Sequence, residues 1–339
     1  MTTLAEVAAR AGVGIGTVSR VVNDHPNVSA RMRVRVEAAM EDVGYTRQRR
    51  SRDKSSDTGE IGVLVPFFDE PSAYLRLRGI VARLQPHGLN IVLYNIASPA
   101  QSRDHIDHLL RAEHLAAIIV ISLPLADADA RQFALRRSPT VLLDTASPHL
   151  PSVGIDDRAG GSMATNHLLQ LGHRRIAFIG EPPQNLFGFI SSARRQEGYT
   201  SALREAGIAP DPGLVRHGAH LRSAARHMAI ELLTLEEPPT AIVAASDVQC
   251  VGVMEAADSL GKRVPRDLSV IGYDDIDLAA LMGITTVRQP LERSGRRVAD
   301  LVVQALSGSA LSPFAEEMEL ELVVRNTTAP VRAAVKRRA

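Results

Sequence analysis

The sequence predicts a small all-α unit at the N-terminus, followed by a larger α/β core of two doubly wound parallel sheets. Two patterns predict this fold class. Residues 1–45 follow the 3.6-residue period of amphipathic helices, whereas short Val- and Ile-rich runs alternate with helix-length stretches from residue 61 onward. The 339-residue chain is also too long for one small core. Residues 46–60 have no apolar face and are expected to form a linker.

The N-terminal unit is expected to contain three short helices. Two segments place apolar residues at positions i, i+3, i+4 and i+7, which lie on one helix face. These residues are Leu4, Val7, Ala8 and Ala11 in the first segment and Val36, Ala39, Met40 and Val43 in the second. Between the segments, Val18, Val21 and Val22 share one face. The polar run 23–27 then breaks the chain, and Ser29 is expected to cap the third helix.

The core is expected to consist of parallel βαβ units. Its strands are predicted from the runs IGVLV (61–65), NIVLY (90–94), AAIIVI (116–121), TVLLD (140–144), RIAFIG (175–180), TAIVAA (240–245) and LSVIGY (268–273). Helix-period stretches between or after them include 159–171, 194–206, 222–235, 248–260 and 291–306. A region of this length can divide into two halves, each with its own sheet.

The stretch RAGVGIGTVSRVVN (10–23) holds three glycines in five positions and is compatible with two motifs. A dinucleotide-binding loop needs a preceding strand and a third glycine where Thr17 stands, but residues 4–11 are helical by period. A helix-turn-helix remains, in which Gly12 supplies the turn and the second helix enters the major groove of DNA. A helical hairpin that packs against a partner protein is the alternative.

Several side chains of the second helix are not needed for the small core and are expected to face DNA. They are Ile15, Gly16, Thr17, Ser19 and Arg20. An arginine can fork onto guanine, an isoleucine can contact a thymine methyl group, and hydroxyls can bind phosphates.

Composition excludes several other classes of protein. No run approaches the roughly 18 apolar residues of a membrane span, and the N-terminus has no uninterrupted apolar segment of the kind that marks a secretory signal. The single cysteine, Cys250, cannot form an internal disulfide and is expected to be an inert buried thiol. We therefore expect a cytoplasmic protein with no membrane partner.

The charge is unevenly distributed although the net charge is only +1. Residues 1–54 carry ten Lys and Arg against six Asp and Glu. Much of this excess lies in TRQRRSRDK (46–54). Such a run is typical of a solvated linker and alone only weakly favours nucleic-acid binding.

Motifs along the whole chain resemble the lactose/galactose repressor (LacI/GalR) family. The N-terminal part resembles that family's headpiece through TLAEVAARAGVGIGTVSRVVN and VSARMRVRVEAAMEDVGY. The rest resembles its regulator core through IGVLVP, PSVGIDDRAGGSMATNHLLQLGHRRIAFIG, EGYTSALREAG, RVPRDLSVIGYDDIDLAAL, TTVRQPLERSGRRVADLV and LELVVRNTTA. The resemblance covers essentially residues 3–329.

The resemblance implies a homodimeric repressor that binds a pseudo-palindromic operator in double-stranded DNA. Its core would be similar to periplasmic sugar-binding proteins, with a small polar effector, a sugar or sugar derivative, bound between two subdomains. The effector must bind one arrangement of the subdomains better than the other for the protein to respond. The tail has no sustained leucine heptads, so a dimer is expected rather than a tetramer.

The expected domain boundaries follow from this resemblance. They are 1–45 for the DNA-binding headpiece, 46–60 for a basic hinge, 61–330 for the core and 331–339 for a basic tail. Subdomain 1 is expected at about 61–158 plus 290–318, and subdomain 2 at about 159–288 plus 319–330. The chain would cross between them near 158–160, 288–291 and 318–320.

The linker departs from the family pattern. That pattern is approximately RPNALARSL and forms a hinge helix that inserts a leucine into the minor groove, whereas this chain has GYTRQRRSRDK, with Lys54 in place of that leucine. A cationic side chain cannot act as the apolar wedge. We expect Arg49, Arg50 and Arg52 to follow phosphates or to enter a narrow minor groove instead. A linker that stays disordered on DNA is the alternative.

The residues expected to contact DNA lie in both the headpiece and the linker. The full set is Thr3, Ile15, Gly16, Thr17, Ser19, Arg20, Asn23, Arg49, Arg50 and Arg52. Gly14 is a further departure, because relatives usually carry serine at that helix N-cap. Glycine caps by geometry at a cost of only about a few tenths of a kcal/mol.

Candidate effector contacts follow the strands of the core, because ligands of doubly wound sheets bind beyond the carboxyl ends of the strands. They are Phe68, Tyr74, Asp144, Asp156, Arg195, His220, Ser246, Asp247 and Asp274. By resemblance, Arg195, Ser246 and Asp274 match positions that hold sugar hydroxyls or other polar ligand groups. Carboxylates with one forked arginine suit a polyol or a sugar. Helix capping and bridging of the subdomains is the alternative role for Asp156, Asp275 and Arg158.

Aromatic side chains in the expected cleft also differ from the family. Ser72 and Ala73 stand where relatives often carry aromatic residues, and His220 stands where an aromatic ring often stacks on the ligand. Phe67, Phe68 or Tyr74 are expected to compensate. A sugar or sugar phosphate is therefore favoured over a planar purine.

Two other function classes fit the sequence less well than a regulator. A sugar-binding transport protein needs export and has no DNA-reading headpiece, and a sugar-processing enzyme needs a catalytic set that the sequence lacks. His105 and His108 offer only two nitrogens on one helix face, so we expect a solvated surface rather than a metal site. No enzyme activity, cofactor or metal is expected.

The arginine-rich linker predicts weak bending of bound operator. Because no apolar wedge unstacks the central base step, the DNA should be bent less, and binding should depend more steeply on salt, than is typical of the family. Gel mobility of circularly permuted fragments, or fluorescence transfer between labelled DNA ends, measures the bend. A sharp kink would contradict the prediction.

Overall fold

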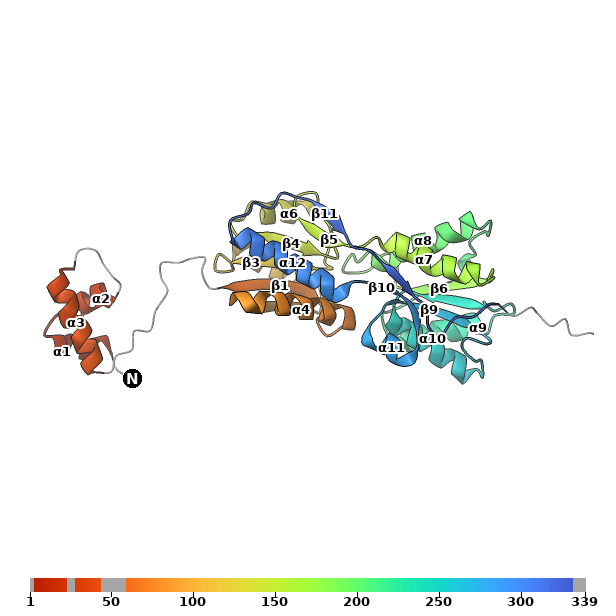
Figure 1. The fold of residues 1–339 in the computed structure, drawn as a ribbon, viewed down its shortest axis with the longest axis horizontal. Coiled ribbons are helices and arrows are strands. Elements are labelled where there is room, and N and C mark those ends of the chain that lie inside the picture. Colours follow the sequence, from red (N-terminus) through yellow and green to blue (C-terminus); the bar gives the residue numbers. More distant parts are fainter. Residues whose placement is uncertain (1–2, 23–27, 44–58, 332–339) are drawn as a thin grey trace, which may run out of the picture. The chain divides into compact units, whose positions relative to one another are not determined.

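The computed structural model describes residues 3–22, 28–43 and 59–331. They belong to two compact units, a headpiece within residues 1–55 and a core within residues 56–339 (Figure 1). Most of the predicted linker and tail lies outside the described residues. In the part of the chain that is described, no helix combines the length and the apolar character that a membrane span requires.

The headpiece is the three-helix unit that the sequence predicts. Its helices are α1 (Leu4–Ala11), α2 (Ile15–Val22) and α3 (Ala30–Asp42). Val7, Val18 and Val36, one from each helix, are fully buried at its centre. Gly12 ends α1 in the left-handed conformation, with φ 62°, which glycine adopts without steric cost. The hydroxyl of Ser29 accepts from the Met32 amide and caps α3, as predicted.

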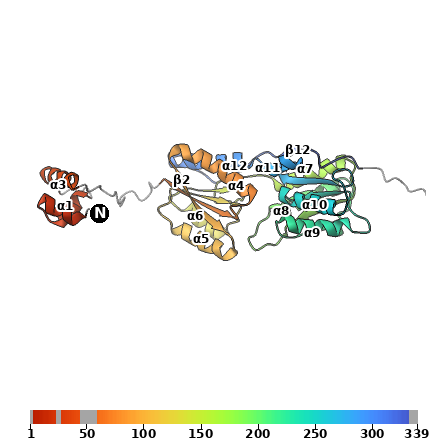
Figure 2. The same cartoon turned by 90° about the horizontal axis from the view of Figure 1, so that it is seen from below.

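The first lobe of the core is built on a six-stranded parallel sheet with strand order β11-β5-β4-β3-β1-β2. The strands are β1 (Glu60–Pro66), β2 (Asn90–Ile96), β3 (Ala117–Ile121), β4 (Thr140–Leu143), β5 (Ser152–Gly154) and β11 (Ala315–Glu317). Its helices are α4 (Pro71–Leu84), α5 (Pro99–Arg111), α6 (Asp127–Ala134) and α12 (Leu291–Leu306), with the short 3-10 turn η1 (Gln85–His87). Helices α4 and α12 cover one face and α5 and α6 the other (Figure 2).

The second lobe repeats this plan with strand order β12-β10-β9-β8-β6-β7, in which only β12 is antiparallel to its neighbour. The strands are β6 (Ile176–Gly180), β7 (Val215–His217), β8 (Ala241–Ala244), β9 (Ser269–Asp274), β10 (Thr285–Arg288) and β12 (Glu321–Val323). The helices are α7 (Asp157–Gln170), α8 (Ser191–Glu205), η2 (Pro212–Leu214), α9 (Arg222–Leu233), α10 (Asp247–Ser259) and α11 (Asp277–Met282). Helices α7 and α8 cover one face and α9 and α10 the other, where Cys250 is fully buried.

The chain passes between the lobes three times, from β5 to α7, from β10 to α12 and from β11 to β12 (Figure 1). The first passage precedes Asp157, slightly before the expected residues 158–160. The carboxylate of Asp156 accepts from the Ala159 amide, which starts α7 at this point, and α7 packs on α8 of the second lobe.

Glycines set the distance between paired helices. In the first lobe, α4 and α12 pack against each other through Gly79 and Gly295. A Cβ atom on Gly79 would lie 2.1 Å from the carbonyl oxygen of Glu292, and one on Gly295 would lie 2.1 Å from the carbonyl oxygen of Arg76. The two backbones therefore approach more closely than any other residue permits.

Helices α7 and α8 of the second lobe approach each other in the same way. The substitution Gly198→Ala tests whether this close packing requires a glycine. In a helix interior alanine is favoured over glycine by about 1 kcal/mol, but a Cβ here would lie 2.0 Å from the Arg158 carbonyl oxygen. We expect the variant to lose about 1–3 kcal/mol of stability, the usual cost of overpacking. Urea unfolding measures this loss, with Ser201→Ala on the same helix as control. A stabilised Gly198→Ala variant would show that the contact relaxes freely.

Candidate functional site

The exposed face of α2 carries the side chains that the sequence assigned to DNA. Val18 and Val21 are buried, which turns the opposite face of the helix outward. The residues on or beside that face are exposed Ile15, Gly16 and Arg20 and half-buried Thr17 and Ser19. The Gly14 carbonyl accepts from the Thr17 and Val18 amides at 2.8 and 3.2 Å, so Gly14 begins the helix through its backbone.

The other predicted DNA contacts have different positions. The Thr3 hydroxyl accepts from the Glu6 amide at 3.4 Å, and the Glu6 carboxylate accepts from the Thr3 amide at 3.0 Å. This reciprocal cap gives Thr3 a structural role at the start of α1. Asn23, Arg49, Arg50 and Arg52 lie outside the described residues.

A cavity of about 760 Å³ lies between the two lobes of the core, at the carboxyl ends of the strands. Its volume falls in the range of small-molecule sites. Five candidate effector residues line it, namely Asp144, Asp156, Arg195, His220 and Asp274. Four others lie outside its wall. Phe68 and Tyr74 are 44% and 55% exposed on the surface, whereas Ser246 and Asp247 are fully buried beneath the cavity.

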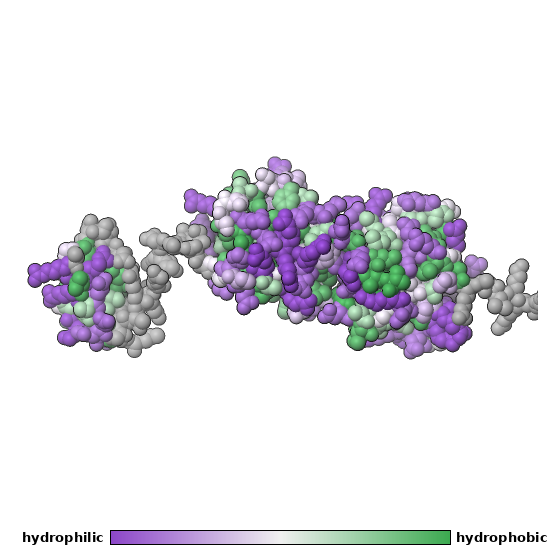
Figure 3. Space-filling view, viewed as in Figure 1, coloured by the Kyte–Doolittle hydropathy of each residue, from purple (hydrophilic) through white to green (hydrophobic). Residues whose placement is uncertain are grey.

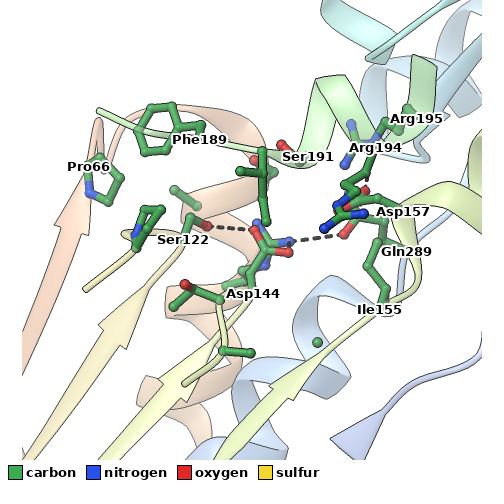
Figure 4. A pocket seen from close by; sticks show the side chains of 18 of the residues that line it. Pro66, Ser122, Asp144, Ile155, Asp157, Phe189, Ser191, Arg194, Arg195 and Gln289 are labelled. Carbon is green, nitrogen blue, oxygen red and sulfur yellow. Dashed lines mark hydrogen bonds and ion pairs between the residues drawn. The ribbon is translucent and has the colours of Figure 1, made fainter. Parts of the chain in front are cut away.

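A buried hydrogen-bonded chain links the two lobes across the floor of the cavity. Arg76 on α4 forms an ion pair of 2.9 Å with Asp144 and donates to Gln289 at 3.0 Å. Gln289, at the second passage between the lobes, donates in turn to Asp274 at 2.6 Å. Ser122 donates to the other oxygen of Asp144 at 2.7 Å (Figure 4). The sequence did not point to Arg76 or Gln289, because neither follows an apolar strand run.

Arg195 is held by partners on three sides. Its Nε donates to Asp157 at 2.8 Å (Figure 4). Its Nη1 donates to the Ala245 carbonyl oxygen at 2.6 Å, and its guanidinium lies 3.7 Å from the Tyr273 ring centre. Burial raises the pKa of Asp157 to about 6, while the charge of Arg195 opposes that rise. Arg195 also lies 3.7 Å from Asp274, so it fixes two carboxylates at the cavity.

His220 lies between carboxylates of both lobes. Its Nδ1 is 3.5 Å from Glu181 of the second lobe, and its Nε2 is 4.0 Å from Glu70 of the first. Burial alone would lower the pKa of His220, but Glu181, Asp274 and Glu70 together raise it above its ordinary value. Burial also raises the pKa of Glu70. A protonated His220 therefore connects the lobes electrostatically.

Strand ends around the cavity adopt a backbone conformation that side chains other than glycine rarely accept. Phe67, Ser122, Asp144 and Asp274 have φ values of 46°, 54°, 60° and 108° and follow or end β1, β3, β4 and β9. All four line the cavity. Left-handed residues of this kind cluster at functional sites, where the surrounding structure holds them in place.

The aromatic wall of the cavity differs from the expected one. It consists of Phe67, Phe187 and Phe189. Phe67 was among the expected compensating residues, but Phe187 and Phe189 come from the loop before α8, which has no strand or helix period and gave no signal in the sequence.

Ser246, Asp247 and Asp275 shape the strand ends beneath the cavity. Ser246 caps α10 by accepting from the Gln249 amide at 3.2 Å. Asp247 accepts from the Thr286 hydroxyl at 2.7 Å and from the Ile276 amide at 3.0 Å. Asp275 pairs with Arg288 and Arg325, both at 2.7 Å. These contacts tie α10 and α11 to β10.

The histidine pair on α5 packs against an aromatic ring. The rings of His105 and His108 lie 5.7 and 5.6 Å from the ring of Tyr94. Within residues 3–22, 28–43 and 59–331, no three His, Cys, Asp or Glu side chains are grouped so that they could hold a metal ion.

Comparisons with known proteins match both units. Residues 3–48 match the family model described as bacterial regulatory proteins, lacI family. Residues 165–328 match the model of a periplasmic binding protein-like domain. The HTH-type transcriptional repressor CytR of Escherichia coli strain K12 is 31% identical over 331 residues, which cover 96% of each chain.

Two solved structures are similar over nearly the whole chain. The transcriptional regulator CelR-cellobiose complex is 31% identical, with a TM-score of 0.71, and the match covers 96% of this chain and all of the other. The lac repressor dimer bound to operator and the anti-inducer ONPF is 29% identical, with a TM-score of 0.72, and the match covers 97% of this chain and 99% of the other.

Because Asp247 is buried, we expect the free energy of unfolding to depend on pH. Burial raises its pKa to about 8, so the folded state holds a proton that an unfolded aspartate releases near pH 4. Its contribution to folding is fully present below about pH 4 and is lost as pH rises through about 8. Asp247→Asn should reduce the loss of stability between pH 5 and pH 9 by roughly 2 kcal/mol or more.

Urea unfolding at the two pH values measures this difference. Asp258→Asn, an exposed change on the same helix, is the control and should follow the wild type. Parallel pH curves for Asp247→Asn and the wild type would show that Asp247 is already ionised in the folded protein.

Proposed function

The chain belongs to the lacI family of bacterial regulatory proteins, and from that premise we propose how its two units act together. It is a DNA-binding regulator of transcription, not an enzyme. We propose that α2 enters the major groove of a pseudo-palindromic operator while the cavity between the lobes binds a small effector. The protein acts as a repressor in the cytoplasm, at the nucleoid when bound to DNA.

The observation that carries this proposal is a cavity lined by charged and aromatic side chains from both lobes. Asp144 lies in the first lobe, Asp274 in the second, and Gln289 lies at a passage between them. An effector that binds these groups differently in the two arrangements of the lobes shifts the population between them. A ligand with equal affinity for both arrangements changes nothing.

The effector is proposed to be a sugar or a sugar derivative. The cavity wall combines carboxylates, which accept from hydroxyls, with phenylalanine rings, on which the apolar face of a sugar ring can stack. The similar CelR structure contains cellobiose. Within the wall, we assign the polar contacts to Asp144, Asp156, Arg195, His220 and Asp274, with Glu70 and Glu181 beside the histidine.

A homodimer is proposed as the form that binds the operator, because two headpieces match two half-sites. The similar lac repressor structure is a dimer on operator. The core exposes large apolar side chains on α4 and α11, among them Tyr74, Val81 and Leu281, and Figure 3 shows apolar patches among the polar surface of the core. A second copy would cover such a surface.

DNA binding tests the regulatory role directly. The purified protein should select a fragment from beside its own gene over random competitor DNA. Arg20→Ala should lose about tenfold or more of that selectivity, since a forked arginine–guanine contact contributes about 1–3 kcal/mol. Fluorescence anisotropy at two salt concentrations measures both affinities, and Arg204→Ala, an exposed change in the core, is the control.

A panel of sugars in a thermal-shift assay then tests the cavity. A ligand at about a hundred times its dissociation constant adds ~2.7 kcal/mol of stability. The same ligand should change operator affinity. Failure to select any fragment, with and without every sugar of the panel, would overturn the proposal.

A further inference from the structure

One loop of the second lobe reaches across the cavity and packs on the first lobe. The segment between β6 and α8 carries Phe187 and Phe189, which lie against the apolar cluster formed by the first sheet with α5 and α6. Between them, Gly188 faces Pro124 of the first lobe, where an added Cβ would lie 3.9 Å from Pro124 Cγ. Figure 4 shows Phe189 and Pro66, at the end of β1, in the same part of the cavity wall.

The aromatic rings of the loop and of the first lobe pack in defined geometries. Phe187 and Phe189 are stacked, with centroids 5.2 Å apart and planes 4° apart. Phe67 of the first lobe meets Phe187 edge-on, at 5.1 Å and 72°. Both arrangements are the favoured geometries of aromatic pairs. Phe67 is held in this position by a left-handed backbone, with φ 46°.

The loop is ordered by its own hydrogen bonds. The Asn185 side-chain oxygen accepts from the amides of Phe187 and Phe189 at 3.2 and 2.9 Å. Its side-chain nitrogen donates to the Phe189 carbonyl oxygen at 2.7 Å. Gly188 has φ 73°, which closes the turn. The turn thus presents both rings with little flexibility left to lose on contact.

The side chains of the loop separate into two sets. Phe187 and Phe189 are partly buried on the first lobe, whereas Leu186 is 84% exposed and Ile190 is 57% exposed. General collapse of an apolar loop would not leave one set in solvent. The contact is therefore specific to the two rings.

We propose that residues 185–189 form an aromatic clasp, which holds the two lobes closed on each other before any effector binds. The two rings of the clasp also line the cavity, as do the charged groups His220 and Asp274. The stability of the closed arrangement then comes partly from contacts between these rings and the first lobe, and the effector binds to lobes that are already held together.

Distances between spin labels in the effector-free, full-length protein test the clasp. Labels at Asp104→Cys on α5 and Ser223→Cys on α9 place one exposed probe on each lobe, and the native Cys250 is fully buried. Double electron–electron resonance then gives the distribution of interlobe distances. The measurement needs neither DNA nor effector, so its result is independent of the proposed regulatory role.

In dimers that pair one labelled with one unlabelled chain, the wild type should show one dominant interlobe distance. Phe187→Ala/Phe189→Ala should raise the ratio of a second, altered distance to the dominant one at least tenfold, and Leu186→Ala should match the wild type. Phe187→Leu/Phe189→Leu should fall between them, because it keeps apolar contact and loses the stacked rings.

Asn185→Ala provides a second variant that leaves the rings and the packed core intact. It removes the hydrogen bonds of the turn and should also raise the altered population, by a smaller factor. Circular dichroism and thermal unfolding verify that each variant is folded. Wild-type distance distributions in both Asn185→Ala and the double alanine variant would overturn the clasp.

Discussion

The core depends on ion pairs and hydrogen bonds among charged side chains that are buried where its two lobes meet. Arg76, Asp144, Asp157, Arg195 and Asp274 all have little solvent exposure at the cavity. An isolated charge at such a depth would be very costly, so each must have a partner. The pairs Arg76–Asp144 and Arg195–Asp157 each lie within one lobe, and Gln289 connects the first pair to Asp274. The floor of the cavity is therefore a continuous polar network.

This network explains why the strand ends are strained. A strand that continued straight would carry Asp144 or Asp274 past the cavity, and a sharp left-handed turn directs the carboxylate inward instead. The cost of a rare backbone conformation, of order 1–3 kcal/mol, is offset by the ion pair or hydrogen bond gained. At Phe67 the left-handed backbone likewise directs the side chain into the cavity, where its ring contacts Phe187 instead of forming an ion pair.

The fold was predictable because the spacing of apolar residues along the sequence follows which side chains are buried. The outward face of α2 followed from the spacing of Val18 and Val21, and the position of the cavity followed from where parallel strands end. Strands of three residues, such as β7 and β12, were not predicted, because they are too short to show a pattern.

The strand pattern predicted Asp144 and Asp274, which follow or end strands, and the family resemblance added Arg195 on α8. Other residues of the site gave no such signal. Arg76 lies inside an amphipathic helix, where an arginine normally indicates a solvated face, yet it is buried. Phe187 and Phe189 lie in a loop whose shape is set by Asn185, and no periodicity describes such a loop. Ser246 and Asp247 do follow a strand, but the cap of α10 turns them beneath the cavity.

The three short passages between the lobes also restrict how the core can respond. Three covalent tethers prevent the sheets from sliding apart, but each passage is only a few residues long and can bend. Gln289 lies in one of these passages and is bonded on both sides. A small displacement of this residue would rotate one lobe relative to the other about an axis through the three passages. Atoms at the ends of the lobes farthest from this axis would move the most.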